Sequence, residues 1–179
     1  MAKLRKMLGK VDEPAVQSLM EIIETQSKET LAAWAVGYVK THTLAIYEKE
    51  FPQDNRLRKA VEAVESCLRG EQKFKDVKPV IKEAADAAKE AGDHPVAQAV
   101  AQAAARSVSV ACNVLGTPTN ALGFTFYTAA AIVYDREGTE EKSDIYDTMA
   151  TKELEKMLIS LKEAAVPDES KPVKVNWRC

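Results

Sequence analysis

Three residues within one short stretch, Asp54, Arg56 and Arg58, have the types and spacing needed to bind a charged group. The local pattern places them at the start of a helix, which Asp54 opens. Positive charge in the first turn of a helix opposes the helix dipole. Two interpretations remain equally open: the two arginines pair with an acidic group inside the fold or on a partner, or they stay solvated at a small energetic cost.

A fourth residue of interest, Arg106, carries the only charge in residues 95–115. On a helical wheel this stretch has an apolar side opposite a polar stripe, which comprises Gln98, Gln102, Arg106, Ser109 and Asn113. We favour a central helix whose alanines let its neighbours approach closely over a functional stripe. If Arg106 is buried, it must meet a carboxylate or several carbonyl groups, because an unpaired buried charge is very costly.

Other catalytic or ligand-binding patterns are weak. The two histidines, His42 and His94, are far apart and neither is followed at i+4 by a metal ligand, so no metal site is predicted. His42 falls on a largely apolar helix face and is expected to pack there. The cysteines form no CxxC pair and no base is evident for any of them; they are Cys67, Cys112 and Cys179. No glycine-rich phosphate loop is present, so we expect no cofactor and no enzymatic activity.

Composition limits the class of protein. The chain has 179 residues, 46% hydrophobic and 29% charged, which is typical of one globular domain. A net charge of −2 argues against a nucleic-acid-binding protein. No apolar run is long enough for a membrane span and no signal peptide is evident. With scattered, reduced thiols, a cytoplasmic protein is expected.

Hydrophobic periodicity predicts an all-α, single-domain bundle of about seven helices around the alanine-rich central helix. The expected helices begin near residue 12, 27, 54, 76, 93, 120 and 143. Residues 120–134 are apolar nearly all round, so other helices or a second copy of the chain should enclose them. We expect a flexible basic lead-in over residues 1–11, the helical domain over residues 12–165, and an extended tail over residues 166–179 that Trp177 packs onto the domain.

Several segments together resemble a known family. They are SLMEIIETQSKETLAAWAVGYV, IYEKEFPQDNRLRKAVEA, AQAAARSV, ALGFTFYTAAAIVYD and VPDESKPVKVNWRC. The likeness, to the Imm-5-like immunity proteins of bacterial polymorphic toxin systems, runs in order along nearly the whole chain. Its most specific part is Asp54-x-Arg56-x-Arg58 followed by Arg106. Many relatives have a proline where this chain has Leu57, and histidines that this chain lacks.

The resemblance implies an all-α protein that binds and neutralises a cognate toxin without catalysis. Two alternatives remain open. One is a small-ligand-binding or enzymatic protein whose pocket collects Glu48, Asp54, Arg56, Arg58 and Arg106. The other is a structural or oligomeric helical protein in which these five residues form an ion-pair network, with Arg106 reaching toward Asp54 or Glu48. For these residues a structural role is favoured over a catalytic one, because one guanidinium can hold several helix ends together.

Overall fold

The computed structural model describes residues 4–92 and 98–177, and in that part of the chain it contains eight α-helices and no strand. The all-α prediction is confirmed. The helices are α1 (Pro14–Ile23), α2 (Lys28–His42), α3 (Leu44–Glu50), α4 (Arg56–Leu68), α5 (Phe74–Gly92), α6 (Ala99–Cys112), α7 (Asn120–Glu137) and α8 (Ser143–Ala164).

One more helix is present than predicted because the helix expected over residues 27–50 is interrupted at Thr43. This residue ends α2 and precedes α3, with φ −116° and ψ −26°. The buried Thr43 hydroxyl bonds the carbonyl of Val39 at 3.2 Å and lies 2.8 Å from the hydroxyl of Ser107 on α6. A threonine hydroxyl that bonds the carbonyl four residues back bends a helix, and here a contact with another helix fixes the bend.

Some predicted helix ends are correct and others are shifted. The Ser27 hydroxyl caps α2 by accepting from the backbone N–H of Thr30, and Gly70 follows α4 with φ +77°. The first helix starts at Pro14 after Glu13 instead of Asp12, and α4 starts after Asn55 instead of Asp54. Gly92 is the last residue of α5, whereas the predicted cap at Asp93 and the start of the central helix at residues 93–97 lie outside the described residues.

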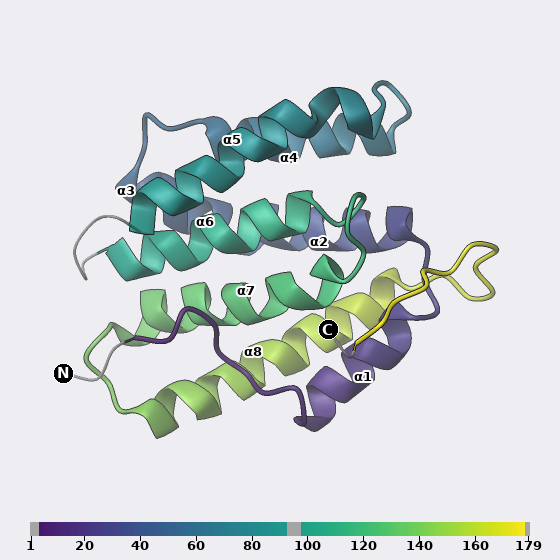
Figure 1. The fold of residues 1–179 in the computed structure, drawn as a ribbon. Helices are drawn as coiled ribbons and strands as arrows, with labels where there is room; N and C mark the ends of the chain where they lie inside the picture. The colour runs from purple at the N-terminus through teal and green to yellow at the C-terminus, as the bar shows by residue number, and fades with distance from the viewer. Residues whose placement is uncertain (1–3, 93–97, 178–179) are drawn as a thin grey trace.

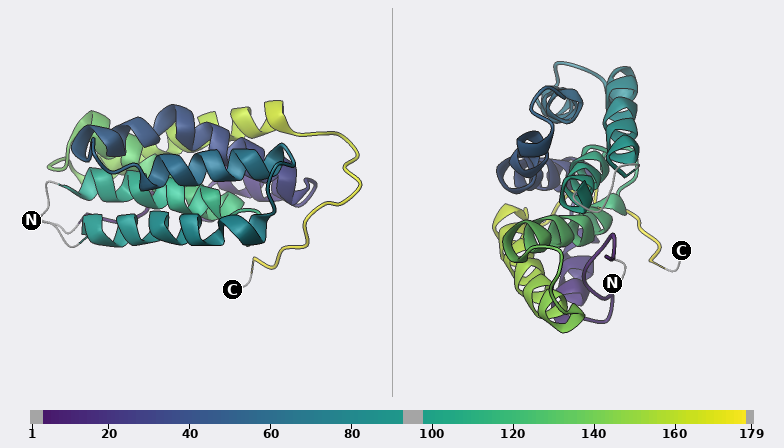
Figure 2. Two further views of the ribbon diagram at one scale, coloured as in Figure 1. Left: turned by 90° about the horizontal axis from the view of Figure 1, so that it is seen from above. Right: turned by 90° about the vertical axis from the view of Figure 1, so that its left-hand side faces the viewer.

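The helices lie roughly side by side in successive layers (Figures 1 and 2). In Figure 1, α4 and α5 form the upper layer, α6 and α2 lie below them, α7 follows, and α8 with α1 completes the stack. The central element is α6, which packs against α2, α3, α4, α5 and α7. Its buried side is made of small residues, so its neighbours approach closely; these residues are Ala101, Ala103, Ala104, Ala105, Ser107 and Ala111.

The other apolar helix, α7, is enclosed within the single chain. It packs against α1, α2, α6 and α8, and its buried residues extend from Ala121 to Tyr134 on several sides. The chain itself therefore covers the apolar surface that suggested self-association.

The segment before α1 differs from the flexible lead-in that we expected over residues 1–11. In its described part, Leu8 is completely buried and its backbone N–H donates to the carbonyl of Phe126 at 3.2 Å. The backbone carbonyl of Arg5 accepts from the Tyr134 hydroxyl at 2.8 Å. Leu8 belongs to the core and Leu4 packs against it, although basic residues neighbour both in the sequence. This burial holds the segment against α7.

The tail after α8 crosses the junction of α1 and α2 as an extended chain, drawn in yellow in Figure 1. The buried Gln26 side chain bonds both the N–H and the carbonyl of Val166, at 2.8 and 3.1 Å. The Gln26 carbonyl accepts from the N–H of Val173 at 2.8 Å. Further along, the Trp177 indole N–H donates to Glu24 at 2.6 Å. These polar contacts and the partly buried Val173 and Trp177 side chains join the tail to the body.

Candidate functional site

Asp54 and Arg56 form the centre of an ion-pair cluster at the start of α4. One carboxylate oxygen of Asp54 accepts from the backbone N–H of Arg56 at 3.1 Å and from its Nε at 3.0 Å, and the other accepts from Nη2 at 2.7 Å. The guanidinium also donates from Nη1 and Nη2 to the two carboxylate oxygens of Glu90 on α5, at 3.0 and 2.6 Å. One guanidinium thus joins the start of α4 to the end of α5.

Tyr47 of α3 completes this arrangement, since its hydroxyl donates to Asp54 Oδ2 at 2.7 Å. Tyr47 is 1% exposed, so the bond lies at the edge of the core. The Arg56 hydrogen bond lowers the pKa of Asp54 from an ordinary value near 3.8 to about 2. Burial, and then the hydrogen bond to Asp54, raise the pKa of Tyr47. Near neutral pH the carboxylate stays ionised and the phenol stays protonated, so neither group is tuned for general acid or base catalysis.

A second pair lies beside the first. Arg58 donates from Nε and Nη2 to the two carboxylate oxygens of Glu48 on α3, both at 2.7 Å. The Arg58 side chain is 46% exposed and that of Glu48 is 28% exposed. We call these two neighbouring ion-pair groups the acid–arginine cluster, which comprises Tyr47, Glu48, Asp54, Arg56, Arg58 and Glu90. Its members hold α3, α4 and α5 together.

Arg106 is not part of this cluster, so the predicted contact with Asp54 or Glu48 is wrong. Among the described residues it forms no ion pair with either carboxylate; its guanidinium lies 6.0 Å from the centre of the Tyr127 ring on α7. The reason is the face of α6 on which it lies. The residue that reaches the α2–α3 junction is Ser107, which bonds Thr43, and consecutive helical residues point about 100° apart.

Sequence reasoning found four members of the acid–arginine cluster and missed Tyr47 and Glu90. Glu90 could have been found from topology, because α4 and α5 are joined by a short turn at Gly70. Two antiparallel helices place the first turn of one beside the last turn of the other, which brings Arg56 opposite Glu90. Tyr47 had no such signal, since its role depends on the break at Thr43 and on its side chain turning toward Asp54.

A surface groove between α2 and α8 combines aromatic, polar and apolar side chains. Its volume is about 440 Å³, and Trp34, Gly37 and His42 line one side while Lys156 and Ile159 line the other. His42 is exposed here, contrary to the packed position that we expected, because α2 ends at this residue. Its ring stacks on Tyr38 with centroids 4.1 Å apart and an angle of 12°.

The groups of the α2–α8 groove are held in place by hydrogen bonds. The Trp34 indole N–H donates to Ser160 at 2.9 Å, and a His42 ring nitrogen lies 3.0 Å from the Tyr38 carbonyl. Burial, and then the nearby Glu153 carboxylate, raise the pKa of the Tyr38 phenol to about 12. The Tyr38 hydroxyl therefore stays protonated, and the groove offers a shaped surface without an activated nucleophile.

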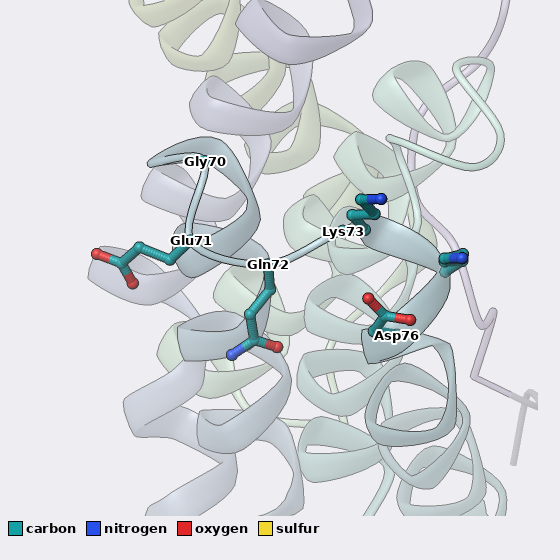
Figure 3. Close-up of a pocket in the computed structure, with 6 residues that line it drawn as sticks. Gly70, Glu71, Gln72, Lys73 and Asp76 are labelled. Atoms are coloured by element: carbon teal, nitrogen blue, oxygen red, sulfur yellow. The ribbon is translucent and has the colours of Figure 1, made fainter.

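A second open hollow of about 410 Å³ lies at the turn between α4 and α5, which Figure 3 shows. Glu71 and Asp76 lie apart from each other in this view, with Gln72 and Lys73 between them. The Glu71 carboxylate is bound by Arg69 at 2.8 and 3.1 Å and by Ser66 at 3.0 Å. The side chains do not converge on a common point, so this hollow forms no catalytic constellation.

The two thiols in the described part of the chain, Cys67 and Cys112, are also poorly placed for chemistry. Cys112 is completely buried, and burial raises its pKa to about 12. Burial likewise raises the pKa of Cys67. A thiol must ionise to act as a nucleophile, so both remain unreactive near neutral pH. Within residues 4–92 and 98–177, no group of three or more His, Cys, Asp or Glu side chains could hold a metal ion.

Comparison with known proteins identifies the family of this helical bundle. A family model described as Imm-5 like putative immunity protein matches residues 21–164, which include every helix from α2 to α8. The chain belongs to this family. No curated protein and no solved structure matches it. In the described part of the chain, no helix is both long and apolar enough to cross a membrane.

Proposed function

We propose that this protein is a cytoplasmic, non-enzymatic immunity protein that binds a cognate toxin and blocks it. The observation that carries the proposal is membership of the immunity-protein family over residues 21–164. The state of the acid–arginine cluster supports it. Both oxygens of Asp54 and all three guanidinium nitrogens of Arg56 are occupied by bonds within the fold, which favours a structural role for these two residues.

The proposal is tested by co-expressing the chain with toxin domains encoded beside it. The expected result is restored growth together with a stable complex that co-elutes in size-exclusion chromatography, and a toxin whose intact mass is unchanged. Restored growth without a complex, or with a modified toxin, would instead show that the protein acts as an enzyme. Absence of both rescue and complex with every neighbouring candidate would overturn the proposal.

A matched pair of variants separates the cluster from the contact surface. Replacing both Glu48 and Arg58 by glutamine removes a half-exposed ion pair without creating an unpaired charge. If the acid–arginine cluster is structural, this double variant rescues growth as well as the unmodified chain. Loss of rescue in a folded double variant would place the toxin contact, or a reaction, at the cluster.

A further inference from the structure

A small cavity that is lined in part by basic side chains lies beside the first two turns of α6. Its volume is about 30 Å³, and the residues around it include Arg5, Lys6, Gln102, Arg106 and Tyr134. Three of these residues are basic, and no aspartate or glutamate is among the described residues that line the cavity. We call this feature the Arg106 cavity.

The Arg106 guanidinium is incompletely satisfied. Its Nε is buried and has no hydrogen-bond partner. The Tyr127 ring lies 6.0 Å from the guanidinium carbon, which is the range of a cation–π contact. That contact stabilises the positive charge but does not accept the N–H bond. A buried donor without an acceptor is unfavourable, and among the described residues the guanidinium has no hydrogen bond or ion pair, so its positive charge lacks a counter-charge.

The neighbouring cations do not supply that acceptor. Arg5 forms an ion pair with Asp147 at 2.6 Å, and Asp147 is not among the residues that line the cavity. Within the described part of the chain, neither Lys6 nor Arg106 forms an ion pair, and Lys6 is exposed. The cavity therefore keeps an excess of positive charge.

The start of α6 adds to this positive potential. Ala99, the first residue of the helix, lines the cavity, and the residue before it, Gln98, makes no side-chain capping bond. The first backbone N–H groups of a helix and its dipole both favour an anion. The helix start and the uncompensated charge of Arg106 are independent features that favour the same kind of ligand.

We propose that the Arg106 cavity binds a small oxyanion of carboxylate size, with Arg106 as its main ligand and Lys6 at the rim. A cavity of about 30 Å³ has room for a group of a few heavy atoms, such as the head of a carboxylate, and is too small for a nucleotide. The carboxylate belongs either to a free small acid or to an acidic side chain of a protein partner. The site goes beyond the proposed function and does not depend on it.

The test is an NMR titration of the full chain with sodium formate, at an ionic strength held constant with sodium chloride, which carries no carboxylate. The expected result is a saturable shift of the backbone amide signals of Gln102, Ala103 and Arg106. Linear shifts without saturation would overturn the proposal.

Three variants assign the site. Arg106→Gln is expected to abolish saturation, and Lys6→Gln to weaken formate binding several-fold. Lys10→Gln, an exposed residue of the same segment that does not line the cavity, should bind as the unmodified chain does. Because Lys6 is exposed, its variant remains folded and keeps the test decisive even if Arg106→Gln unfolds. Equal binding by all variants would overturn the assignment.

A second arm identifies the source of the carboxylate. If an acidic side chain of the toxin fills the cavity, formate competes with the toxin complex and Arg106→Gln weakens that complex. If the complex is insensitive to both, the occupant is a free acid. The formate titration needs no toxin, so failure of the proposed function leaves its result unchanged.

Discussion

The guanidinium of Arg56 bonds two carboxylates, whereas that of Arg106 lies against a tyrosine ring and a cavity lined by other cations. Both side chains belong to helices of the same bundle, and both occupy partly buried positions. Arg56 links α4 to α5 through charge-assisted bonds that are complete without any partner. Arg106 has a buried donor that nothing in the described structure accepts. The first arrangement is typical of a structural link, and the second of a binding site.

The largest expected loss of stability comes from removing the guanidinium of Arg56. Arg56→Met leaves the Asp54 carboxylate, whose side chain is 17% exposed, next to Glu90 with no cation between them. Because losing one partner leaves an uncompensated charge, we expect the free energy of unfolding to fall by about 2 to 3 kcal/mol. Urea unfolding followed by circular dichroism measures this change. If the free energy of unfolding falls by less than an ordinary surface substitution lowers it, Arg56 does not have the proposed structural role.

The next effect is a dependence of stability on pH. The pKa of Asp54 is lowered to about 2 in the folded protein, below its ordinary value near 3.8. A lowered carboxyl pKa contributes stability that is complete above pH 4 and is lost as the pH falls toward 2. Relative to Asp54→Asn, the unmodified chain should lose about 2 kcal/mol over this interval. Urea titrations of both proteins from pH 6 to pH 2 give the difference, and a constant difference would contradict the predicted ion pair.

Removing the Arg106 guanidinium is expected to change the free energy of unfolding in the opposite direction from removing that of Arg56. Arg106→Met keeps the aliphatic packing of the stem while removing a buried donor that has no acceptor. Loss of the Tyr127 contact offsets part of the gain, so the free energy of unfolding should rise by at most about 1 kcal/mol. Urea unfolding in a buffer free of carboxylates and phosphate measures it. A clear loss of stability would show that Arg106 is already compensated and would remove the contrast with Arg56.

The smallest expected effect is at the exposed pair of the acid–arginine cluster. Arg58→Met breaks the bond to Glu48, but the Arg58 side chain is 46% exposed and water can replace the lost contacts. We expect a change of about 0.5 kcal/mol or less in the free energy of unfolding. This variant is the matched control for Arg56→Met, since it removes the same functional group two residues away. Equal losses at both positions would mean that burial does not distinguish the two pairs.

Periodicity and caps were enough to predict the class of fold and most helices. They predicted the alanine-rich α6 as the central element, the enclosure of α7, and the cap at Ser27, because these features depend on the spacing of apolar side chains or on local bonds. The break at Thr43 could not be predicted, since the Ser107 hydroxyl that accompanies it belongs to a helix sixty-four residues away. The burial of Leu8 was missed because the four basic residues near it in the sequence suggested an exposed segment.

The candidate site was predicted in part for a related reason. Arg58 and Glu48 meet on adjacent helices, and Glu48 was included among the candidate residues because of the resemblance to the Imm-5-like family, not because of its spacing from Arg58. The partner of Arg106 was predicted wrongly, because a helical wheel gives the face of a residue relative to its own helix only. Which neighbour covers that face depends on how α6 is rotated against α3 and α7, and that rotation follows from packing of the whole core.

The contact of α1 with α8 has a consequence for the order in which the chain is made. These helices pack together although more than a hundred residues separate them in the sequence. Helices α4, α5 and α6 contact each other and follow one another directly, so they can associate while synthesis continues. During translation, α1 emerges early with Leu19 and Ile23 uncovered and must wait for α8. The newly made N-terminal part therefore presents an apolar surface that chaperones can bind until the second half of the chain has left the ribosome.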